Sequence, residues 1–259
     1  YRDLHTFRIT GGEPLLSPNT FKVLEYIQEH WEQNPNISLA INTNLSVPQK
    51  LIDKLITIAE DLVNNNKVRE LIIFTSIEAT GRQAEYVRFG LNAEEFWSNI
   101  DKILTKLPKV TVNIMAAFNA LSVFTYSELI DKVLHYKKKY HNDVRYWRTP
   151  LQLDTSYTRW PPHLNVKILD RKHQDLIYLA AVKALYYGAN GMSKLKYGFT
   201  DVEIQKIKRT YDYAIGPGQF DIEKHRKDFR VFIKQYDERR YTNFIETFPE
   251  LEQLYFHED

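Results

Sequence analysis

The chain has 259 residues, 43% of them hydrophobic, and a formal net charge of +2. This composition supports a sizeable core, while the small charge gives no electrostatic footprint for nucleic acid. No apolar run approaches the length of a membrane-spanning helix, so no membrane partner is expected. The sequence has no cysteine, which excludes disulfides and thiolate metal sites within these residues.

Several other site patterns are missing from the sequence. The eight histidines show neither HxxxH nor HxH spacing, so no histidine metal site is predicted. There is no P-loop, GxGxxG or GxSxG motif, which argues against the common NTPase and hydrolase classes. The chain starts at Tyr1 without a signal-peptide pattern and enters its first strand almost at once. We therefore expect a cytoplasmic protein whose natural N-terminal part precedes this residue.

Apolar runs of strand length recur along the first 150 residues, and segments with helical spacing of apolar residues lie between them. In chain order, the predicted strands are 5–9, 37–43, 70–74, 110–115 and 144–148. The predicted helices between them are 17–33, 51–62, 92–107 and 125–140. The strand at 70–74 is nearly all apolar, so we expect it to be buried on both faces.

Local signals refine these elements. Ser17 and Pro18 are typical of the N-cap and the first residue of a helix. Residues 46–49 and 125–128 have the pattern of capping boxes. Residues 75–91 form a long polar loop. Since most connections in α/β proteins have two to about six residues, a loop of this length is usually functional.

Residues 152–162 are expected to be irregular, and a helix is predicted at 171–187. Beyond Gly191 the character of the sequence changes to helices rich in aromatic and charged residues, predicted at 200–214, 221–240 and from 243 onward. The sequence therefore predicts an α/β domain over 1–190 and a helical C-terminal extension over 191–259.

Alternating strands and helices are typical of a parallel α/β sheet. The spacing of apolar residues fits an open doubly wound sheet and a partial (β/α) barrel equally well. Both folds bind ligands at the carboxyl ends of their strands. The polar clusters of this sequence fall at those ends, at 11–13, 42–44, 76–78, 119 and 152–154. This placement predicts a binding edge independently of any family.

The first cluster lies in residues 5–16, which read HTFRITGGEPLL. Paired glycines open positive φ and let the backbone approach a ligand closely. Pro14 holds Glu13 in an extended conformation. A charged acceptor and free backbone groups therefore converge at a strand end. A plain Gly-Gly connection with a solvated glutamate is the alternative that the spacing leaves open.

Residues 8–16, RITGGEPLL, closely resemble the GGEP motif of the radical S-adenosylmethionine (radical SAM) superfamily. The resemblance implies a partial (β/α)6 TIM-like barrel that lacks the first strand and the CxxxCxxC cluster loop. It implies S-adenosylmethionine as cofactor, with its methionine amino group held by the turn of Gly11, Gly12, Glu13 and Pro14. It also implies a 4Fe–4S cluster, whose cysteine ligands are not in this chain.

The loop 75–91 is similar to the segment after the fourth strand in radical SAM enzymes of the twitch and SPASM kind. The tail 232–251 also looks like the C-terminal part of twitch-domain members. The resemblance assigns the ribose of the cofactor to Ser76 and Glu78. It assigns the carboxylate of the cofactor to Arg88, because a guanidinium matches a carboxylate bidentately. Arg82 is the competitor for this last role.

Two asparagines at further strand ends are weaker candidates. Asn42 lies in an Asn-Thr-Asn segment that looks like the TN-containing third strand of the family. Asn119 is a candidate for contact with the ribose or the substrate. Local turn chemistry is the alternative for both side chains.

The resemblance implies reductive cleavage of S-adenosylmethionine to a 5′-deoxyadenosyl radical that abstracts hydrogen from a substrate. The implied partners are a reductant such as flavodoxin or ferredoxin and an unknown substrate, either a peptide or a small molecule. No catalytic acid or base can be named, and we expect this chain alone to be inactive. Two alternatives stay open: a non-catalytic nucleoside-binding α/β module that has lost the cluster, and an unrelated α/β protein with a coincidental GGEP.

Overall fold

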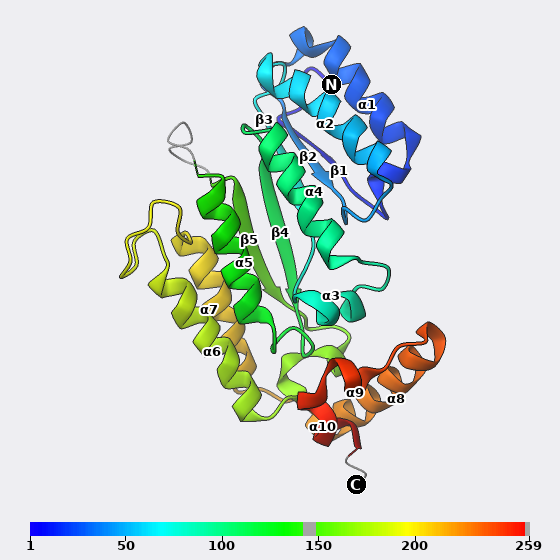
Figure 1. Ribbon diagram of the computed structural model, residues 1–259, viewed down its shortest axis with the longest axis vertical. Coiled ribbons are helices and arrows are strands. Elements are labelled where there is room, and N and C mark those ends of the chain that lie inside the picture. The colour runs from blue at the N-terminus through cyan, green and yellow to red at the C-terminus, as the bar shows by residue number, and fades with distance from the viewer. Residues whose placement is uncertain (142–148, 257–259) are drawn as a thin grey trace. The chain divides into compact units, whose positions relative to one another are not determined.

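The computed structural model describes residues 1–141 and 149–256. Its five strands form one parallel sheet in the order β1-β2-β3-β4-β5 (Figure 1). The strands are Thr6–Ile9, Ser38–Asn42, Glu70–Thr75, Thr111–Phe118 and Leu151–Tyr157. The order of these described strands never reverses, so they lack the switch point at which a doubly wound sheet binds its ligand.

Helices connect and follow these strands, as the alternating sequence pattern predicts. They are α1 (Pro18–Glu29), α2 (Gln49–Asn64), α3 (Gly81–Val87), α4 (Ala93–Lys106), α5 (Tyr126–Lys139), α6 (Arg171–Tyr186), α7 (Asp201–Ile215), α8 (Ile222–Arg240), α9 (Phe244–Thr247) and α10 (Glu252–Phe256). The predicted α/β class is confirmed. Among the described residues, none of these helices combines the length and the apolar character needed to cross a lipid bilayer.

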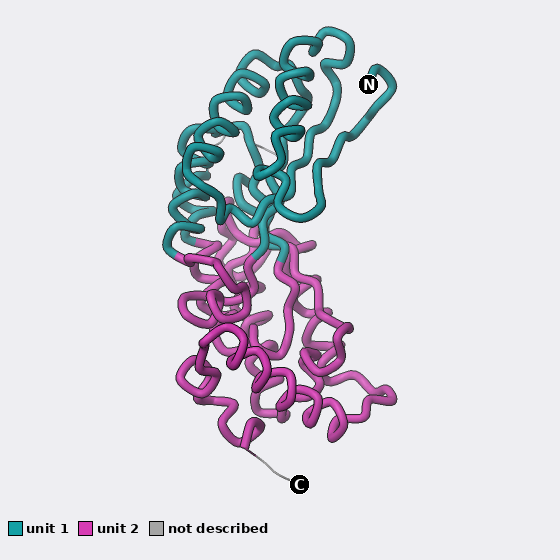
Figure 2. Tube along the Cα trace, turned by 90° about the vertical axis from the view of Figure 1, so that its right-hand side faces the viewer, with its two compact units in different colours: residues 1–76, 94–115, 135–153 teal, residues 77–93, 116–134, 154–259 magenta. Residues whose placement is uncertain are grey.

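The chain folds into two compact units (Figure 2). Unit 1 consists of 1–76, 94–115 and 135–153, and unit 2 consists of 77–93, 116–134 and the chain from 154 onward. The strands β4 and β5 begin in unit 1 and end in unit 2. The segments of the two units therefore alternate along the chain, whereas the sequence suggested a single division after residue 190.

In unit 1, α1 and α2 lie on one side of the strands β1–β3 (Figure 1). Successive side chains of a strand point to opposite faces of the sheet. On β3, Leu71 and Ile73 are fully buried, whereas Ile72 and Phe74 are only half-buried. The expectation that this strand is buried on both faces is therefore wrong. One face of the sheet is fully covered and the other remains partly open.

The capping box predicted at 46–49 does not form. Pro48 occupies the N-cap position of α2, and no side chain caps this helix. The backbone N–H of Ser46 instead donates to the side-chain oxygen of Asn44 at 2.8 Å. This local turn competes with the capping geometry, since asparagine side chains readily hydrogen-bond the backbone two residues on.

The loop predicted at 75–91 contains the short helix α3. Its sequence includes the helix formers Arg82, Gln83, Ala84 and Glu85. The polar composition hid the helix because only Ala84 and Tyr86 supply an apolar buried face. The stretch is therefore a helix with two short flanks rather than one long loop.

The strand β5 lies where an irregular segment was expected. Leu151, Leu153 and Thr155 are buried, and they alternate with half-buried Gln152 and Asp154. This is the period-two pattern of a strand with one covered face. The polar residues at alternate positions obscured it. The strand predicted at 144–148 lies outside the described residues.

Candidate functional site

The strand β1 ends in a turn with a left-handed backbone conformation, which glycine adopts more readily than any other residue. Gly11 has a φ of +99° and Gly12 a φ of +52°, both in the region that L side chains rarely adopt. Both residues are exposed, and no heavy atom lies within 4 Å of the position that a Cβ would take on either. The turn therefore leaves open space beside its backbone at the carboxyl end of β1.

The carboxylate of Glu13 is held by two backbone N–H groups. Its Oε2 accepts a hydrogen bond from Asn44 N at 2.7 Å, and its Oε1 accepts one from Leu15 N at 3.1 Å. Its backbone is extended, as the following Pro14 requires. A carboxylate has about four acceptor positions, so this one retains capacity for a further donor. Since Asn44 follows β2, the carboxylate links the ends of two neighbouring strands.

Arg8 and Asn42 form a second polar pair in unit 1. The Nε of Arg8 donates to Oδ1 of Asn42 at 2.9 Å. The guanidinium also lies 4.1 Å from the centre of the Phe74 ring, within the range of a cation–π contact. The predicted residue Asn42 is thus joined to an arginine that was not singled out as a site residue. The available signal was a charged residue inside an otherwise apolar strand.

Asn113 adds a polar atom to the half-open face of the sheet. It lies beside Phe74 in the register of β3 and β4, so both side chains point to the same face. Its Oδ1 is buried and has no hydrogen-bond partner among the described residues. A buried acceptor of this kind is normally satisfied by water or a ligand. This face is therefore suited to accept a donor from a bound molecule.

A hollow of about 410 Å³ lies along β1 and the beginning of α1. This volume falls within the range of small-molecule sites, ~300–1,000 Å³. The hollow is lined by residues of β1, the glycine turn and α1: Phe7, Arg8, Ile9, Thr10, Gly11, Glu13, Pro14, Ser17, Asn19, Thr20 and Val23. The predicted residues Gly11 and Glu13 thus border a space large enough for a small ligand.

Glu78 and Arg88 form an ion pair in unit 2. The Nε of Arg88 lies 2.7 Å from Oε2 of Glu78. The side chain of Glu78 is 5% exposed and that of Arg88 is 28% exposed. Burial raises the pKa of Glu78, and the nearby guanidinium opposes this shift without cancelling it. The two residues that the resemblance assigns to a cofactor therefore bind each other.

The helix α3 between these two residues is anchored to the C-terminal helices. The hydroxyl of Tyr86 donates to Oδ1 of Asp237 on α8 at 2.9 Å. The same carboxylate accepts hydrogen bonds from Thr242 Oγ1 at 2.7 Å and from Phe244 N at 2.8 Å. The C-terminal segment 237–244 thus packs against the segment that contains α3.

Thr80 ties the beginning of the same segment to α5. Its backbone N–H donates to Thr125 Oγ1 at 3.0 Å, and its hydroxyl donates to Glu128 at 2.8 Å. The two residues expected to form a capping box thus bond the segment that holds Glu78. Both ends of this segment are fixed within unit 2, and Arg82 on α3 is exposed.

The remaining predicted residues lie at strand ends. Ser76 directly follows β3 in unit 1 and is half-buried. Asn119 directly follows β4 in unit 2, and its side-chain oxygen accepts from Leu121 N at 2.9 Å while its Nδ2 donates to Ala117 O at 3.1 Å. The Asn119 side chain is thus engaged in its own turn. Its role toward a ligand stays a prediction.

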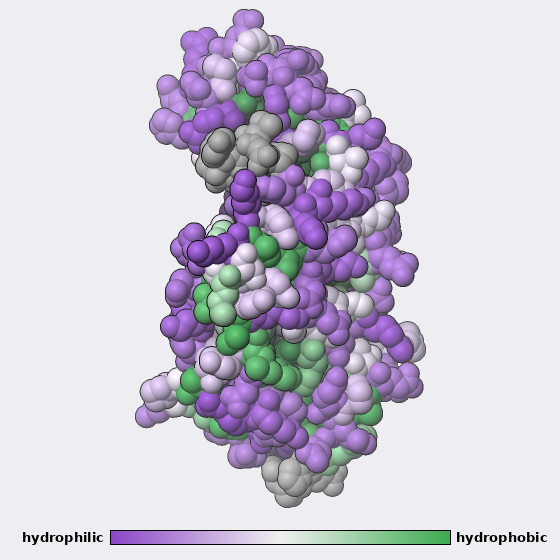
Figure 3. Space-filling view, turned by 60° about the vertical axis from the view of Figure 1, so that its left-hand side comes forward, coloured by the Kyte–Doolittle hydropathy of each residue, from purple (hydrophilic) through white to green (hydrophobic). Residues whose placement is uncertain are grey.

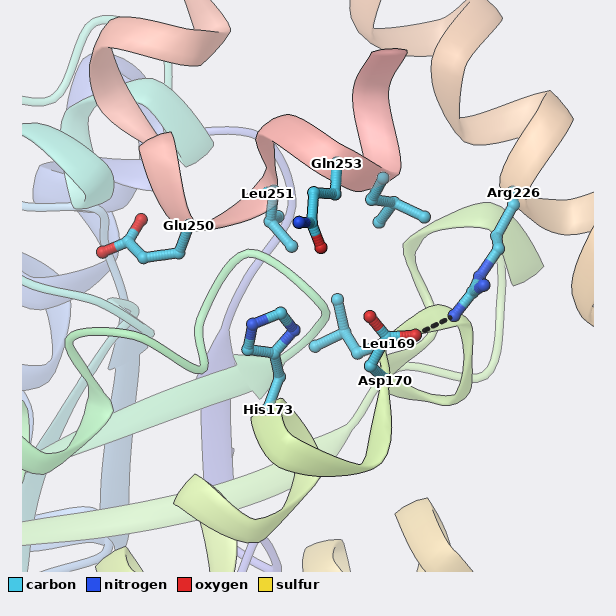
Figure 4. A pocket seen from close by; sticks show the side chains of 8 residues that line it. Leu169, Asp170, His173, Arg226, Glu250, Leu251 and Gln253 are labelled. Atoms are coloured by element: carbon cyan, nitrogen blue, oxygen red, sulfur yellow. Dashed lines mark hydrogen bonds and ion pairs between the residues drawn. The ribbon is translucent and has the colours of Figure 1, made fainter. Parts of the chain in front are cut away.

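A second pocket in unit 2 is much smaller, about 10 Å³ (Figure 4). It holds the volume of about one water molecule. The imidazole of His173 points into it, and the Nδ1 of this ring is buried without a hydrogen-bond partner among the described residues. An ion pair of 2.8 Å joins Arg226 and Asp170 beside it. Burial lowers the pKa of His173. This pocket is too small for a substrate.

Two findings bear on metals and relatives. Within 1–141 and 149–256, no group of three or more histidine, aspartate or glutamate side chains is placed to hold a metal ion. Comparison with protein-family models, with curated proteins and with solved structures finds no match to this chain.

Proposed function

We propose that this chain is the S-adenosylmethionine-binding part of a radical SAM enzyme. The observation that carries the proposal is the carboxylate of Glu13, which two backbone N–H groups fix beside the left-handed turn of Gly11 and Gly12. A preoriented carboxylate with free acceptor capacity suits an ammonium group, because a charge-assisted hydrogen bond is stronger than a neutral one. The amino group of the methionine moiety is such a donor.

The space around this turn fits the methionine end of the cofactor. The hollow of about 410 Å³ is bordered by Gly11 and Glu13. No atom fills the positions of the missing Cβ atoms on the two glycines. Backbone carbonyl groups of the turn can therefore approach the ammonium together with the carboxylate. The donors and acceptors offered by unit 1 match this ligand.

The sheet also supports the family fold. Sequential parallel strands with right-handed connections place their helices on one face, as in a (β/α) barrel. In such a barrel the other face points inward and surrounds the ligand. We assign Arg8, Phe74 and Asn113 of the half-open face to that interior. The proposed architecture is a partial (β/α)6 TIM-like barrel.

The chain by itself does not fit a 4Fe–4S cluster. Thiolates are the usual ligands of such clusters, and the sequence has no cysteine. The proposal therefore requires cluster ligands from outside these 259 residues. When bound, cluster and cofactor supply the radical chemistry, whereas the protein binds and orients the reactants.

The role of Arg88 is compatible with its ion pair to Glu78. Only its Nε donates to the glutamate. A guanidinium has five N–H donors, so the two terminal nitrogens remain suited to a carboxylate. We propose that Arg88 binds the cofactor's carboxylate through this edge, and that Ser76 and Glu78 accept hydrogen bonds from ribose hydroxyls. Variants test these roles separately from that of Glu13.

Titration with two ligands tests the proposal. S-adenosylmethionine carries the amino and carboxylate groups, whereas 5′-methylthioadenosine lacks both. Isothermal titration is expected to show at least about tenfold tighter binding of S-adenosylmethionine, since a charged hydrogen bond contributes roughly 1.5–3 kcal/mol. Equal affinities would favour the non-catalytic nucleoside-binding module. Binding of neither ligand would refute both.

The reading frame upstream of Tyr1 provides a second test. A CxxxCxxC segment within a few tens of residues would supply the required thiolates and support the enzyme. A frame without such a segment would refute the catalytic part of the proposal and leave the binding part to the titration.

A further inference from the structure

Helix α6 of unit 2 carries an apolar stripe on its outer side. Figure 3, in which the side with α6 and α7 comes forward, shows hydrophobic residues gathered in one area of the surface. Five large apolar or aromatic side chains of the second half of α6 are between 42% and 59% exposed. They are Tyr178, Leu179, Val182, Leu185 and Tyr186. At 100° per residue they occupy an arc of about 120°, the width of a typical packed helix face.

The opposite side of the same half-helix is also apolar. Ile177, Ala180, Ala181 and Ala184 are buried. A helix that is apolar on nearly all sides is normally covered on all sides. The inner face of α6 is buried within unit 2, whereas the apolar stripe on its outer face is exposed.

The stripe has a sequence that is almost a palindrome. Residues 178–186 read YLAAVKALY, and reversal of the order exchanges only Ala181 and Lys183. A twofold interface requires that residue i of one copy meets residue j of the other while j meets i. Two antiparallel α6 helices centred on Val182 satisfy this condition. Tyrosine then faces tyrosine, leucine faces leucine, and Val182 faces its own copy.

We propose that the α6 stripe, residues 178–186, is a homodimer interface in which two copies of the chain pack antiparallel about a twofold axis at Val182. This interface is independent of the proposed function. It uses only residues of unit 2, none of which belongs to the candidate site.

The charges of the stripe are compatible with this packing. Lys183 is the single ionisable lysine, arginine, aspartate or glutamate within 178–186. Its ammonium is bound by Asp131 at 2.6 Å and by Ser127 Oγ at 2.9 Å. Lys183 is therefore neutralised within its own chain, and no like charges confront each other across the axis.

The apolar area is of the right order. Each exposed side chain of the stripe offers on the order of 100 Å², so five together approach the largest patches of ordinary monomers, ~300–600 Å². Met192 is 83% exposed, and the hydrogen bond of 3.1 Å from Ser193 N to Tyr186 O places it beside the end of the stripe. With Met192 the apolar area reaches about 600 Å² per copy, the lower end of a standard interface.

Analytical ultracentrifugation of the full chain tests the proposal. The unmodified chain is expected to be a dimer at about 100 µM, a concentration above the dissociation constants usual for interfaces of this size. Val182→Glu should weaken association by at least about 100-fold, because two carboxylates meet on the axis. Val231→Glu is the matched control, since Val231 is 52% exposed on α8, and it should leave the dimer intact. A monomeric unmodified chain, or association that survives Val182→Glu, would overturn the proposal.

A cysteine variant gives a second test that does not depend on a disruptive charge. Helices with axes ~8–10 Å apart and Cα radii of ~2.3 Å bring facing Cα atoms to ~3.4–5.4 Å, which overlaps the range for a disulfide. The chain has no cysteine, so Val182→Cys introduces a single thiol. With oxidised glutathione it should form a disulfide-linked dimer rapidly, whereas Val231→Cys should not. Equal rates for both variants would overturn the proposal.

Discussion

The guanidinium of Arg88 binds the buried carboxylate of Glu78 with an Nε–Oε2 distance of 2.7 Å, across ten residues of the chain. The pair closes the segment that contains α3. Burial raises the pKa of Glu78 although a cation is in contact with it, so desolvation outweighs the attraction at this position. The ion pair therefore closes the segment at a buried carboxylate whose ionised form is disfavoured by burial.

Glu78→Gln tests this balance through the pH dependence of stability. The raised pKa means that the folded state binds this proton more tightly than the unfolded chain. The resulting stabilisation is present below the ordinary pKa of 4.5 and is lost as the pH rises through the higher folded value. As the pH rises above 4.5, the free energy of unfolding of the unmodified chain should therefore fall relative to that of Glu78→Gln.

Urea denaturation of both proteins, from about pH 4 to about pH 8, measures this difference. Glu29→Gln is the control, since Glu29 is exposed on α1, and its difference from the unmodified chain should stay nearly constant. A Glu78→Gln difference that is constant or has the opposite slope contradicts the prediction.

Glu13→Gln tests the proposed ammonium site. The variant keeps the shape of the side chain but removes its charge and places an NH2 group against one of the two backbone donors. A hydrogen bond to a charged group contributes roughly 1.5–3 kcal/mol, so the affinity for S-adenosylmethionine should fall by about ten- to a hundredfold. Titration calorimetry compares it with Glu29→Gln. Unchanged affinity would make Glu13 a turn residue only.

Arg88→Lys and Arg82→Lys test which of the two arginines, Arg82 on α3 or Arg88 directly after it, binds the carboxylate of the cofactor. An ammonium is a single point charge and cannot bind Glu78 and a carboxylate ligand in the planar geometry of a guanidinium. Arg88→Lys should thus weaken S-adenosylmethionine binding almost as much as Arg88→Ala, by about tenfold or more. Arg82 is exposed, so Arg82→Lys should have little effect. The reverse result would exchange the two assignments.

Tyr86→Phe tests the anchor of α3. The variant removes the hydroxyl that binds Asp237 and leaves the aromatic packing in place. Asp237 keeps its bonds to Thr242 and Phe244, so the loss should be that of one hydrogen bond to a charged group, ~1.5–3 kcal/mol in the free energy of unfolding. Tyr241→Phe is the control because Tyr241 is 97% exposed. Equal stability of both variants would show that this bond contributes nothing.

The alternation of strands and helices was predictable because each element carries its own apolar period. Exceptions arose where polar residues interrupted the continuous apolar run by which the other strands were recognised. Gln152 and Asp154 concealed β5 because they stand on its half-open face. The turn at Asn44 was not predicted for another reason. Several consecutive polar side chains can each hydrogen-bond the local backbone, and the sequence alone does not show which of these bonds forms.

The site was predictable only where its signal was local. The positive φ of Gly11 and the extended backbone of Glu13 follow from their immediate neighbours. The pairing of Tyr86 with Asp237 joins residues 151 positions apart, and no period or motif encodes such a contact. The bond between Glu78 and Arg88 was likewise missed, because each was assigned to a ligand and not to the other.

The alternation of the two units along the chain has a consequence for synthesis on the ribosome. Unit 1 is complete only after residue 153 has been made, although its first segment ends at residue 76. By then two segments of unit 2 have already been synthesised, ahead of the C-terminal helices of the same unit. Since compact units generally fold as wholes, no single cut of the chain releases either unit intact, and a nascent chain cannot complete unit 1 before residue 153 has been made.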